Sequence, residues 1–286
     1  MKYEISFVKY HGCGNDFILK DERRGRRTPD KIRSRMATLL CNRHFSVGAD
    51  GTIFVEPAHG VEGSMRLFEP AGNEADMCGN GLRCVAAYLM EKLHRSEVSI
   101  LTRDGIKLVS RSGRDYRVDM GPVRTDSKDL MEYIKLVGKR RESLMDLRIN
   151  TGGCDMRGSL VNSGEPHFVV KTKDVDAARV REIGDAINKD TALFPRGVNI
   201  DLVEAVGPSR IKVRTYERGV YDETLACGTG ATASAAVALL RGWVKKRQVK
   251  VDTVGGCLRI DVDADGTTYM TGPAERVFEG RIRIDV

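Results

Sequence analysis

Two short cysteine segments in this chain have the residue types that acid–base chemistry needs. Residues 77–81 (Met-Cys-Gly-Asn-Gly) and residues 226–230 (Ala-Cys-Gly-Thr-Gly) each place a cysteine before glycines and an apolar, alanine-containing run. A residue at the start of a helix lies beside backbone N–H groups that lack helical partners and beside the positive end of the helix dipole. We therefore expect Cys78 and Cys227 to be thiols at helix N-termini, with lowered pKa values.

The spacing of these segments predicts an internal duplication. The two cysteines are 227 − 78 = 149 positions apart, and the Gly-Pro pairs that follow them place Pro122 and Pro273 at 273 − 122 = 151. Such a nearly constant offset is typical of two homologous halves. We expect an N-terminal half of residues 1–121 plus 273–286, in which the C-terminal segment returns to complete the first half. The C-terminal half is then 122–272, entered through a charged joining segment, 122–150, and the active site lies in the cleft between the halves.

The elements that must position the cysteines are mostly strands, so we expect an α/β (α+β) fold in which a curved, mostly antiparallel sheet surrounds a central helix in each half. The helix after Cys78 has an apolar stripe from Leu82 to Leu93, and residues 231–240 are small or apolar on nearly every side, as in a buried helix. A further helix should begin at Thr28-Pro29-Asp30. Glycine and aspartate turns separate the expected strands. These are 5–8, 17–19, 51–55, 64–68, 98–102, 106–110 and 116–120 in the first half, and 160–162, 168–171, 198–203, 210–216, 248–253, 257–262 and 267–271 in the second.

Two thiols on opposite faces of one carbon can invert a stereocentre. A thiolate removes the α-proton from one face, and the opposing thiol delivers a proton to the other. The N–H groups at the glycines could hold the carboxylate next to that carbon. Three other interpretations stay open: a disulfide, a nucleophilic thiol partnered by His167, and a metal site at 11–13 or 41–44. Paired Cys-x-x-Cys spacing is absent, and we expect no metal.

Composition limits the function further. The net charge is +7, with a basic cluster at residues 23–27, but aromatic residues are only 6% and no nucleic-acid motif occurs. The cluster is typical of a solvated loop, and a positive surface suits a small anionic substrate, so we expect no nucleic-acid partner. No apolar run is long enough for a membrane span. Seven cysteines, an odd number, indicate free thiols in the cytoplasm. The oligomeric state is open, with a homodimer as the alternative to a monomer.

Five segments of the chain form a specific set of motifs: residues 14–17, 48–51, 74–84, 216–219 and 223–230. With these motifs the chain resembles diaminopimelate epimerases along essentially its whole length. This resemblance implies a fold of two pseudo-symmetric halves and an isomerase of lysine biosynthesis that interconverts LL- and meso-diaminopimelate without a cofactor. The sequence has neither a dinucleotide fingerprint nor a phosphate loop, and paired thiols make pyridoxal phosphate unnecessary.

The resemblance also assigns roles to residues. Cys78 and Cys227 become the acid–base pair, and His167 and Glu217 adjust the pKa values of the thiols. Further residues match positions that contact substrate, either at the reacting carboxylate (Gly79, Asn80, Gly228 and Thr229) or mostly at the distal end (Asn15, Asn199, Glu217 and Arg218). From the residues alone, Asn15 and Asn199 are equally typical of turns, and His167 of a structural histidine.

Three departures from the family pattern concern the substrate. Glu69 and Glu165 stand where family members have asparagines that can contact the distal end, so both are candidate substrate-binding residues, and Tyr221-Asp222 makes the loop before Cys227 one residue longer than in shorter members. The two acids should disfavour a distal carboxylate unless they turn away or are protonated. One alternative is a racemase of the same two-thiol family that acts on a basic amino acid such as lysine or arginine. An alternative of another class is a non-catalytic anion-binding module, against which the retention of cysteine in both halves argues.

Overall fold

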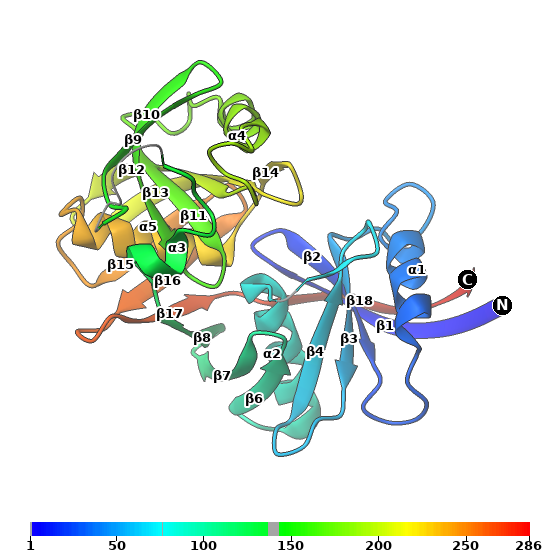
Figure 1. The fold of residues 1–286 in the computed structure, drawn as a ribbon. Helices are drawn as coiled ribbons and strands as arrows, with labels where there is room; N and C mark the ends of the chain where they lie inside the picture. The colour runs from blue at the N-terminus through cyan, green and yellow to red at the C-terminus, as the bar shows by residue number, and fades with distance from the viewer. Residues whose placement is uncertain (1, 76, 137–142) are drawn as a thin grey trace. The chain divides into compact units, whose positions relative to one another are not determined.

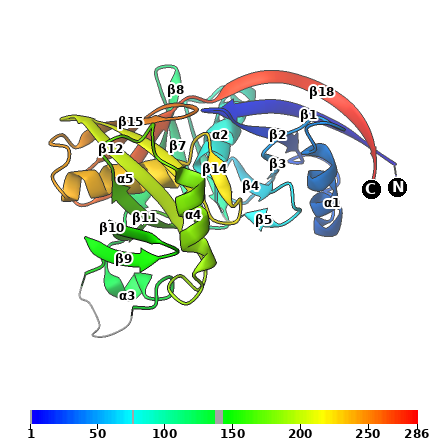
Figure 2. The same ribbon diagram turned by 90° about the horizontal axis from the view of Figure 1, so that it is seen from above.

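The computed structural model describes residues 2–75, 77–136 and 143–286. The chain divides into two compact units, Met1–Asp119 with Thr271–Val286, and Met120–Met270. Figure 1 shows the first unit in blue to teal with the red C-terminal strand, and the second in green to orange; Figure 2 gives the view from above. Asp76 of the cysteine motif and residues 137–142 of the expected joining segment lie outside the described residues.

Among the described residues, the first unit contains a sheet and two helices, of 11 and 15 residues. Its strands pair in the order β18, β1, β2, β3, β4, β6, β7, β8, and β5 is added to β4. The β2–β3 and β4–β6 pairs are parallel and the others antiparallel. The elements are β1 (Lys2–Gly12), β2 (Asn15–Asp21), α1 (Asp30–Leu40), β3 (Gly51–Glu56), β4 (Gly63–Phe68), β5 (Glu74–Ala75), α2 (Gly79–Leu93), β6 (Glu97–Thr102), β7 (Gly105–Ser112), β8 (Asp115–Pro122) and β18 (Glu275–Asp285).

The second unit has the same plan. Its strands pair in the order β9, β10, β11, β12, β13, β15, β16, with β14 added to β13 and with β11–β12 and β13–β15 parallel. The elements are α3 (Ser127–Leu130), β9 (Leu147–Thr151), β10 (Cys154–Asn162), β11 (Pro166–Lys171), α4 (Val180–Lys189), β12 (Asn199–Gly207), β13 (Arg210–Glu217), β14 (Asp222–Thr224), α5 (Gly228–Leu240), β15 (Gln248–Thr253), β16 (Gly256–Val262) and β17 (Thr267–Gly272).

The two pairing orders confirm the duplication. Each unit has parallel pairs at the same two steps of the order, a short strand just before its cysteine, and a long helix just after it. The equivalent helices α1 and α4 begin 180 − 30 = 150 positions apart, which matches the spacing in the sequence. All fourteen expected strands lie within observed strands apart from residue 198. Strand β18 pairs with β1 in antiparallel orientation.

The central helix of each unit is buried by the sheet around it. Helix α5 packs against β10, β11, β12, β13, β15 and β16, and its residues from Gly228 to Ala238 are all buried. Small side chains allow this burial, because they let strands approach the helix on every side. Helix α2 corrects the expectation of a single apolar stripe. It is buried on all sides from Gly79 to Met90, whereas Leu93 at its end is 38% exposed.

Candidate active site

Cys78 is the N-cap of α2, and its thiol faces a hydrogen-bonded asparagine. Its backbone is extended, and its Sγ accepts the N–H of Gly81 at 3.4 Å. The thiol donates to Asn15 Oδ1 at 3.7 Å, and Asn80 Nδ2 donates to the same oxygen at 3.2 Å. The structure therefore brings three of the predicted site residues together: Cys78, Asn80 and Asn15.

Asn15 is held in this orientation by a charged cluster behind it. Its Nδ2 donates to Asp50 Oδ2 at 2.8 Å, and Arg43 donates to both Asp50 (2.5 Å) and Asp16 (2.7 Å). Burial would raise the pKa of Asp16, but hydrogen bonds from Arg43 and Lys9 outweigh it and hold that pKa at about 2. Because Asp50 fixes the amide nitrogen, the amide oxygen of Asn15 points at the thiol.

Cys227 is the N-cap of α5 and begins a chain of buried hydrogen bonds. Its Sγ accepts the N–H of Gly230 at 3.3 Å and lies 3.3 Å from Thr229 Oγ1. That hydroxyl lies 3.0 Å from His167 Nε2, and His167 Nδ1 lies 2.7 Å from Asp201 Oδ2. His167 and Asp201 are both fully buried. We call Asp201, His167, Thr229 and Cys227 the thiol relay.

The electrostatics around Cys227 correct one expectation. Burial raises the pKa of its thiol well above the usual value, and the negative charges of Glu217 and Asp201 raise it further. The hydrogen bonds from Thr229 and from the Gly230 N–H act in the opposite direction but are outweighed. The prediction of a lowered pKa is therefore wrong for Cys227, because desolvation and two carboxylates oppose the helix N-terminus.

Glu217 is a second titratable group beside this thiol. Burial raises the pKa of its carboxyl group, while a hydrogen bond from Thr224 Oγ1 (2.5 Å) and the charge of His167 lower it. Because the charge of Glu217 contributes to the raised pKa of Cys227, Glu217 lies where it can adjust the thiol.

The residues predicted for the distal end of the substrate are held by other protein groups. Arg218 donates from Nε to Glu165 Oε2 at 3.0 Å and from Nη2 to the same oxygen. Asn199 Oδ1 accepts the N–H of Arg218 at 2.9 Å, and its Nδ2 donates to Pro166 O at 3.0 Å. Asn199 thus shapes the backbone of this second unit. In the first unit, Glu69 accepts a hydrogen bond from Asn73 within its own turn.

Two residues that hold the site in place, Asp201 and Asp50, were not among the predicted site residues. Asp201 is a fully buried acid in the apolar strand β12, and β12 pairs in parallel with the strand of His167. A charged residue inside an apolar strand is itself a signal, because a buried charge needs a partner. Asp50 lies in the quoted segment 48–51, but nothing in the sequence shows that it holds Asn15. Asp201 also explains why residue 230 is glycine, because a Cβ atom there would lie 2.5 Å from Asp201 Oδ1.

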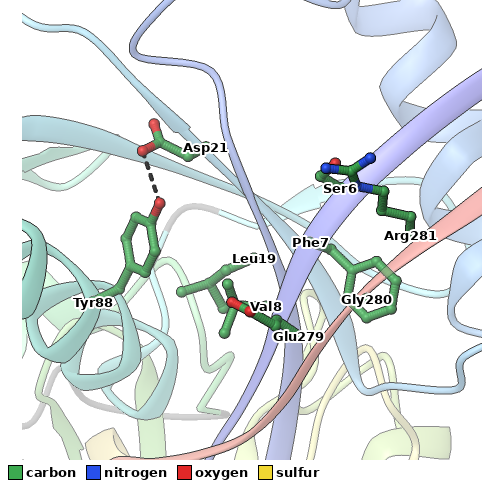
Figure 3. A pocket seen from close by; sticks show the side chains of 9 residues that line it. All are labelled: Ser6, Phe7, Val8, Leu19, Asp21, Tyr88, Glu279, Gly280 and Arg281. Atoms are coloured by element: carbon green, nitrogen blue, oxygen red, sulfur yellow. Dashed lines mark hydrogen bonds between the residues drawn. The ribbon is translucent and has the colours of Figure 1, made fainter.

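A separate cavity of about 450 Å³ lies in the first unit (Figure 3). Phe7, Leu19, Tyr88 and Arg281 line it, and Tyr88 Oη donates to Asp21 Oδ2 at 2.9 Å. None of its lining residues belongs to the predicted site. Among the described residues, no group of three or more His, Cys, Asp or Glu side chains is arranged to hold a metal, and no helix is long and apolar enough to cross a membrane.

Comparison with solved structures defines the fold class. A hydroxyproline epimerase from Agrobacterium vitis superposes with a TM-score of 0.70 at 15% identity, covering 100% of this chain and 95% of that one. A PhzF-family phenazine biosynthesis protein from Bacillus anthracis gives a TM-score of 0.68 at 16% identity, covering 99% and 100%. The chain therefore has the two-unit fold that these epimerase and PhzF structures share.

Sequence comparison narrows this class to one family. The model of the diaminopimelate epimerase family matches residues 7–125 and 159–277. The diaminopimelate epimerase of Pelotomaculum thermopropionicum is 38% identical over 283 residues, covering 96% of this chain and 98% of the relative. That of Synechocystis sp. is 38% identical over 290 residues, covering 98% and 99%. The chain belongs to the diaminopimelate epimerase family.

Proposed function

We propose that this protein is an isomerase that interconverts LL- and meso-diaminopimelate, using Cys78 and Cys227 as the acid–base pair. One observation carries the proposal. In a member of this family, each duplicated unit has a cysteine as the N-cap of its buried central helix, with an oxygen of another side chain beside the sulfur. The resemblance to relatives of that name supplies the substrate.

The proposed reaction moves protons only. The α C–H bond breaks, its proton passes to the sulfur of one thiolate, and the electron pair stays on the α-carbon beside the carboxylate. The S–H bond of the other cysteine then breaks as its proton joins the opposite face. The backbone at Gly79–Asn80 and Gly228–Thr229 heads the two helices, where N–H groups and the helix dipole stabilise the negative charge that develops.

The raised pKa of the Cys227 thiol indicates its protonation state before the reaction begins. A thiol whose pKa lies well above the usual value is protonated at neutral pH. Cys227 therefore starts as the proton donor in the free enzyme, and the two-thiol mechanism then assigns the role of base to Cys78. In the reverse direction Cys227 must lose its proton, and Glu217 and the thiol relay are the neighbouring groups through which this can occur.

The substrate test uses heavy water. Reduced protein is incubated in D2O with LL-diaminopimelate and, separately, with L-lysine, while α-proton exchange and chiral product are followed. We expect deuterium at the α-carbon and meso product from diaminopimelate, and neither from lysine. If only lysine exchanged its α-proton, lysine would take the place of diaminopimelate as the proposed substrate. If neither amino acid exchanged, the catalytic proposal would be refuted.

A second candidate function is supported by one contact. Glu165 already neutralises the guanidinium of Arg218. A distal carboxylate of the substrate must therefore compete with the Glu165 carboxylate for Arg218, whereas the distal ammonium of a basic amino acid does not compete with Glu165. A racemase of lysine or arginine is therefore the alternative that the heavy-water experiment distinguishes.

Replacing Glu165 with asparagine should favour diaminopimelate. Glu165→Asn frees two N–H donors of Arg218 for the distal carboxylate, and charge-assisted hydrogen bonds of this kind support roughly a tenfold gain in kcat/KM. The measurement is the ratio of kcat/KM on diaminopimelate to that on lysine. Glu69→Asn is the matched control, since Glu69 is bonded within its own turn and should change the ratio less. An unchanged ratio in Glu165→Asn would show that Glu165 does not compete with substrate.

We further propose that the protein works in the reducing cytoplasm and without a cofactor. All seven cysteines lie within the described residues and none forms a disulfide there, and unpaired cysteines are typical of proteins in a reducing compartment.

A homodimer is the proposed assembly, supported by the exposed apolar side chains of Val277 and Phe278 on β18. Sedimentation measures this state.

A further inference from the structure

The same ion pair occurs at equivalent places in the two units. Arg66 Nε lies 2.7 Å from Glu74 Oε1, and its Nη2 lies 2.7 Å from Oε2. Arg214 Nε lies 2.6 Å from Glu223 Oε1, and its Nη2 lies 2.8 Å from Oε2. Both pairs are bidentate through the same atoms, and this fork geometry fixes direction as well as distance.

Each pair links a core strand to the short strand that leads to the cysteine. Arg66 lies on β4 and Glu74 on β5, where Phe68 is the register partner of Glu74. Arg214 lies on β13 and Glu223 on β14, where Tyr216 is the register partner of Glu223. The glutamates precede the cysteines by the same number of positions, 78 − 74 = 4 and 227 − 223 = 4.

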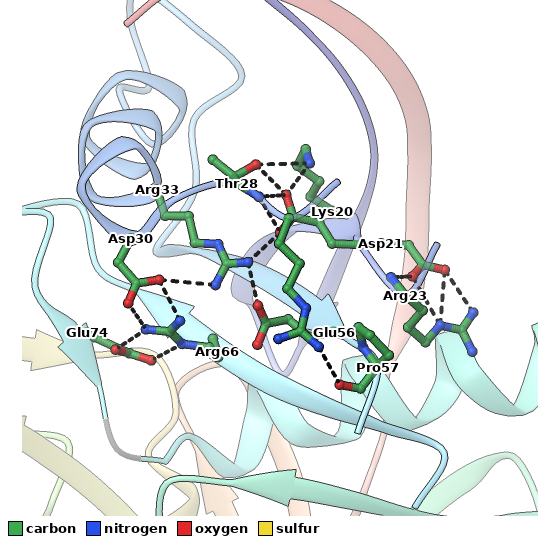
Figure 4. A network of polar contacts seen from close by, with 12 residues as sticks. Lys20, Asp21, Arg23, Thr28, Asp30, Arg33, Glu56, Pro57, Arg66 and Glu74 are labelled. Carbon is green, nitrogen blue, oxygen red and sulfur yellow. Dashed lines mark hydrogen bonds and ion pairs between the residues drawn. The ribbon is translucent and has the colours of Figure 1, made fainter. Parts of the chain in front are cut away.

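Each arginine also forms hydrogen bonds at the start of a second helix of its own unit, α1 in the first unit and α4 in the second. Arg66 donates to both oxygens of Asp30, the first residue of α1, at 2.6 and 3.0 Å (Figure 4). Arg214 Nη1 donates to the carbonyl oxygens of Val175, Asp176 and Ala178, just before α4 begins at Val180. One guanidinium in each unit thus joins three segments: a core strand, the short strand before the cysteine, and the beginning of a helix.

We propose that Arg66–Glu74 and Arg214–Glu223 are duplicated positioning pairs that hold the loops carrying Cys78 and Cys227 in the orientation needed for proton transfer. Neither pair touches the reacting atoms. Each sets where its own thiol lies, and small displacements of a reacting group can lower the rate by up to about 10²-fold. The effect on catalysis rests on the proposed function, whereas the effect on each thiol does not.

The test measures the effect of each ion pair on the cysteine of its own unit. Arg66→Lys and Arg214→Lys keep the charge but remove the fork. Iodoacetamide is added to each folded variant, and alkylation of every cysteine is followed by mass spectrometry. We expect the alkylation rate to change at least about threefold at Cys78 alone in Arg66→Lys and at Cys227 alone in Arg214→Lys. We expect kcat for epimerisation to fall roughly tenfold in each, with KM changing less.

A matched control is available on the β9–β10 hairpin. Arg148 forms a similar bidentate pair with Asp155, at 2.8 and 2.5 Å, on strands that carry neither Cys78 nor Cys227. Arg148→Lys should leave both alkylation rates and kcat unchanged. Where a lysine variant fails to fold, the neutral double variant Arg66→Gln/Glu74→Gln takes its place and should show the same change at Cys78.

Two outcomes overturn the proposal. Equal changes at both cysteines in each variant would show general destabilisation, and unchanged alkylation with unchanged kcat would show that the pairs position nothing. If no variant or wild-type protein exchanges α-protons but alkylation still changes at one cysteine per variant, the positioning pairs stand and the proposed activity fails.

Discussion

Replacing either Cys78 or Cys227 with serine should lower kcat for epimerisation by roughly 10³-fold or more, while leaving the protein folded. General acid–base transfer by a positioned group contributes about 10²–10⁴-fold, and a hydroxyl group is far too weak an acid to replace a thiol at neutral pH. Serine is nevertheless a favoured N-cap, so it keeps the hydrogen bond that each sulfur now accepts from Gly81 or Gly230. The serine variants therefore separate the chemistry of the thiol from its role in capping the helix.

The alanine variants complete this comparison. Cys78→Ala and Cys227→Ala remove both the acid–base group and the cap, so they should lose activity and also about 1 kcal/mol of stability relative to serine. The measurements are kcat by chiral analysis and the midpoint of urea unfolding. Cys257→Ala, which changes an exposed thiol on β16, is the control and should retain activity. More than a tenth of wild-type activity in either serine variant would contradict the two-thiol mechanism.

The duplicated fold could be predicted because its signals are local and repeated. Glycine turns separate the β-rich segments, and the cysteine motifs recur at a constant offset, so the strands and the central helices follow from pattern alone. The short strands β5 and β14 were missed, since two or three residues carry no periodicity, and β9 was missed because it begins inside the charged segment 122–150. Helix α4 was missed as well, although Val180, Gly184 and Ile187 bury one face of it.

The electrostatics of the site could not be predicted in the same way. The sequence places Cys227 at a helix N-terminus, which predicts a lowered pKa, but only the fold brings Glu217 and Asp201 close to it and removes it from water. The same holds for Glu165. Its position in the family pattern suggests a contact with substrate, whereas the structure shows that its partner is Arg218. Asp201 is 227 − 201 = 26 positions from Cys227 and Glu165 is 218 − 165 = 53 positions from Arg218, so tertiary packing decides these contacts.

The thiol relay gives the second large prediction, which concerns Asp201. When His167 is neutral with its proton on Nδ1, that proton is donated to Asp201, and Nε2 accepts the hydrogen of Thr229. The Thr229 oxygen can then accept the proton of the Cys227 thiol. When His167 is protonated, Nε2 donates to Thr229, and the threonine hydroxyl can donate to a thiolate. One proton on His167 thus switches Thr229 from accepting a hydrogen bond to donating one.

Asp201→Asn should break this switch. The asparagine amide can donate to Nδ1 and so favour the tautomer with its proton on Nε2, and a wrong tautomer in a buried carboxylate–histidine pair lowers kcat by about 10²–10⁴-fold. The thiol should respond in the opposite direction. Asp201 is one of the negative charges that raise the pKa of Cys227, and such a pKa falls when the charge is removed. Alkylation of Cys227 should therefore begin at lower pH, even though catalysis is slower.

This pair of opposite changes distinguishes a relay from a merely structural residue, because loosened packing alone predicts no link between slower turnover and a more acidic thiol. Thr215→Val is the matched control. Thr215 Oγ1 donates to Asp201 Oδ1 at 2.7 Å, so this variant removes the other hydrogen bond of the same carboxylate and leaves the contact with His167 intact. It should retain most of the activity and keep the pH profile of Cys227 alkylation. If Asp201→Asn and Thr215→Val lost activity equally, with no shift in that profile, Asp201 would support the packing of β12 rather than the chemistry of Cys227.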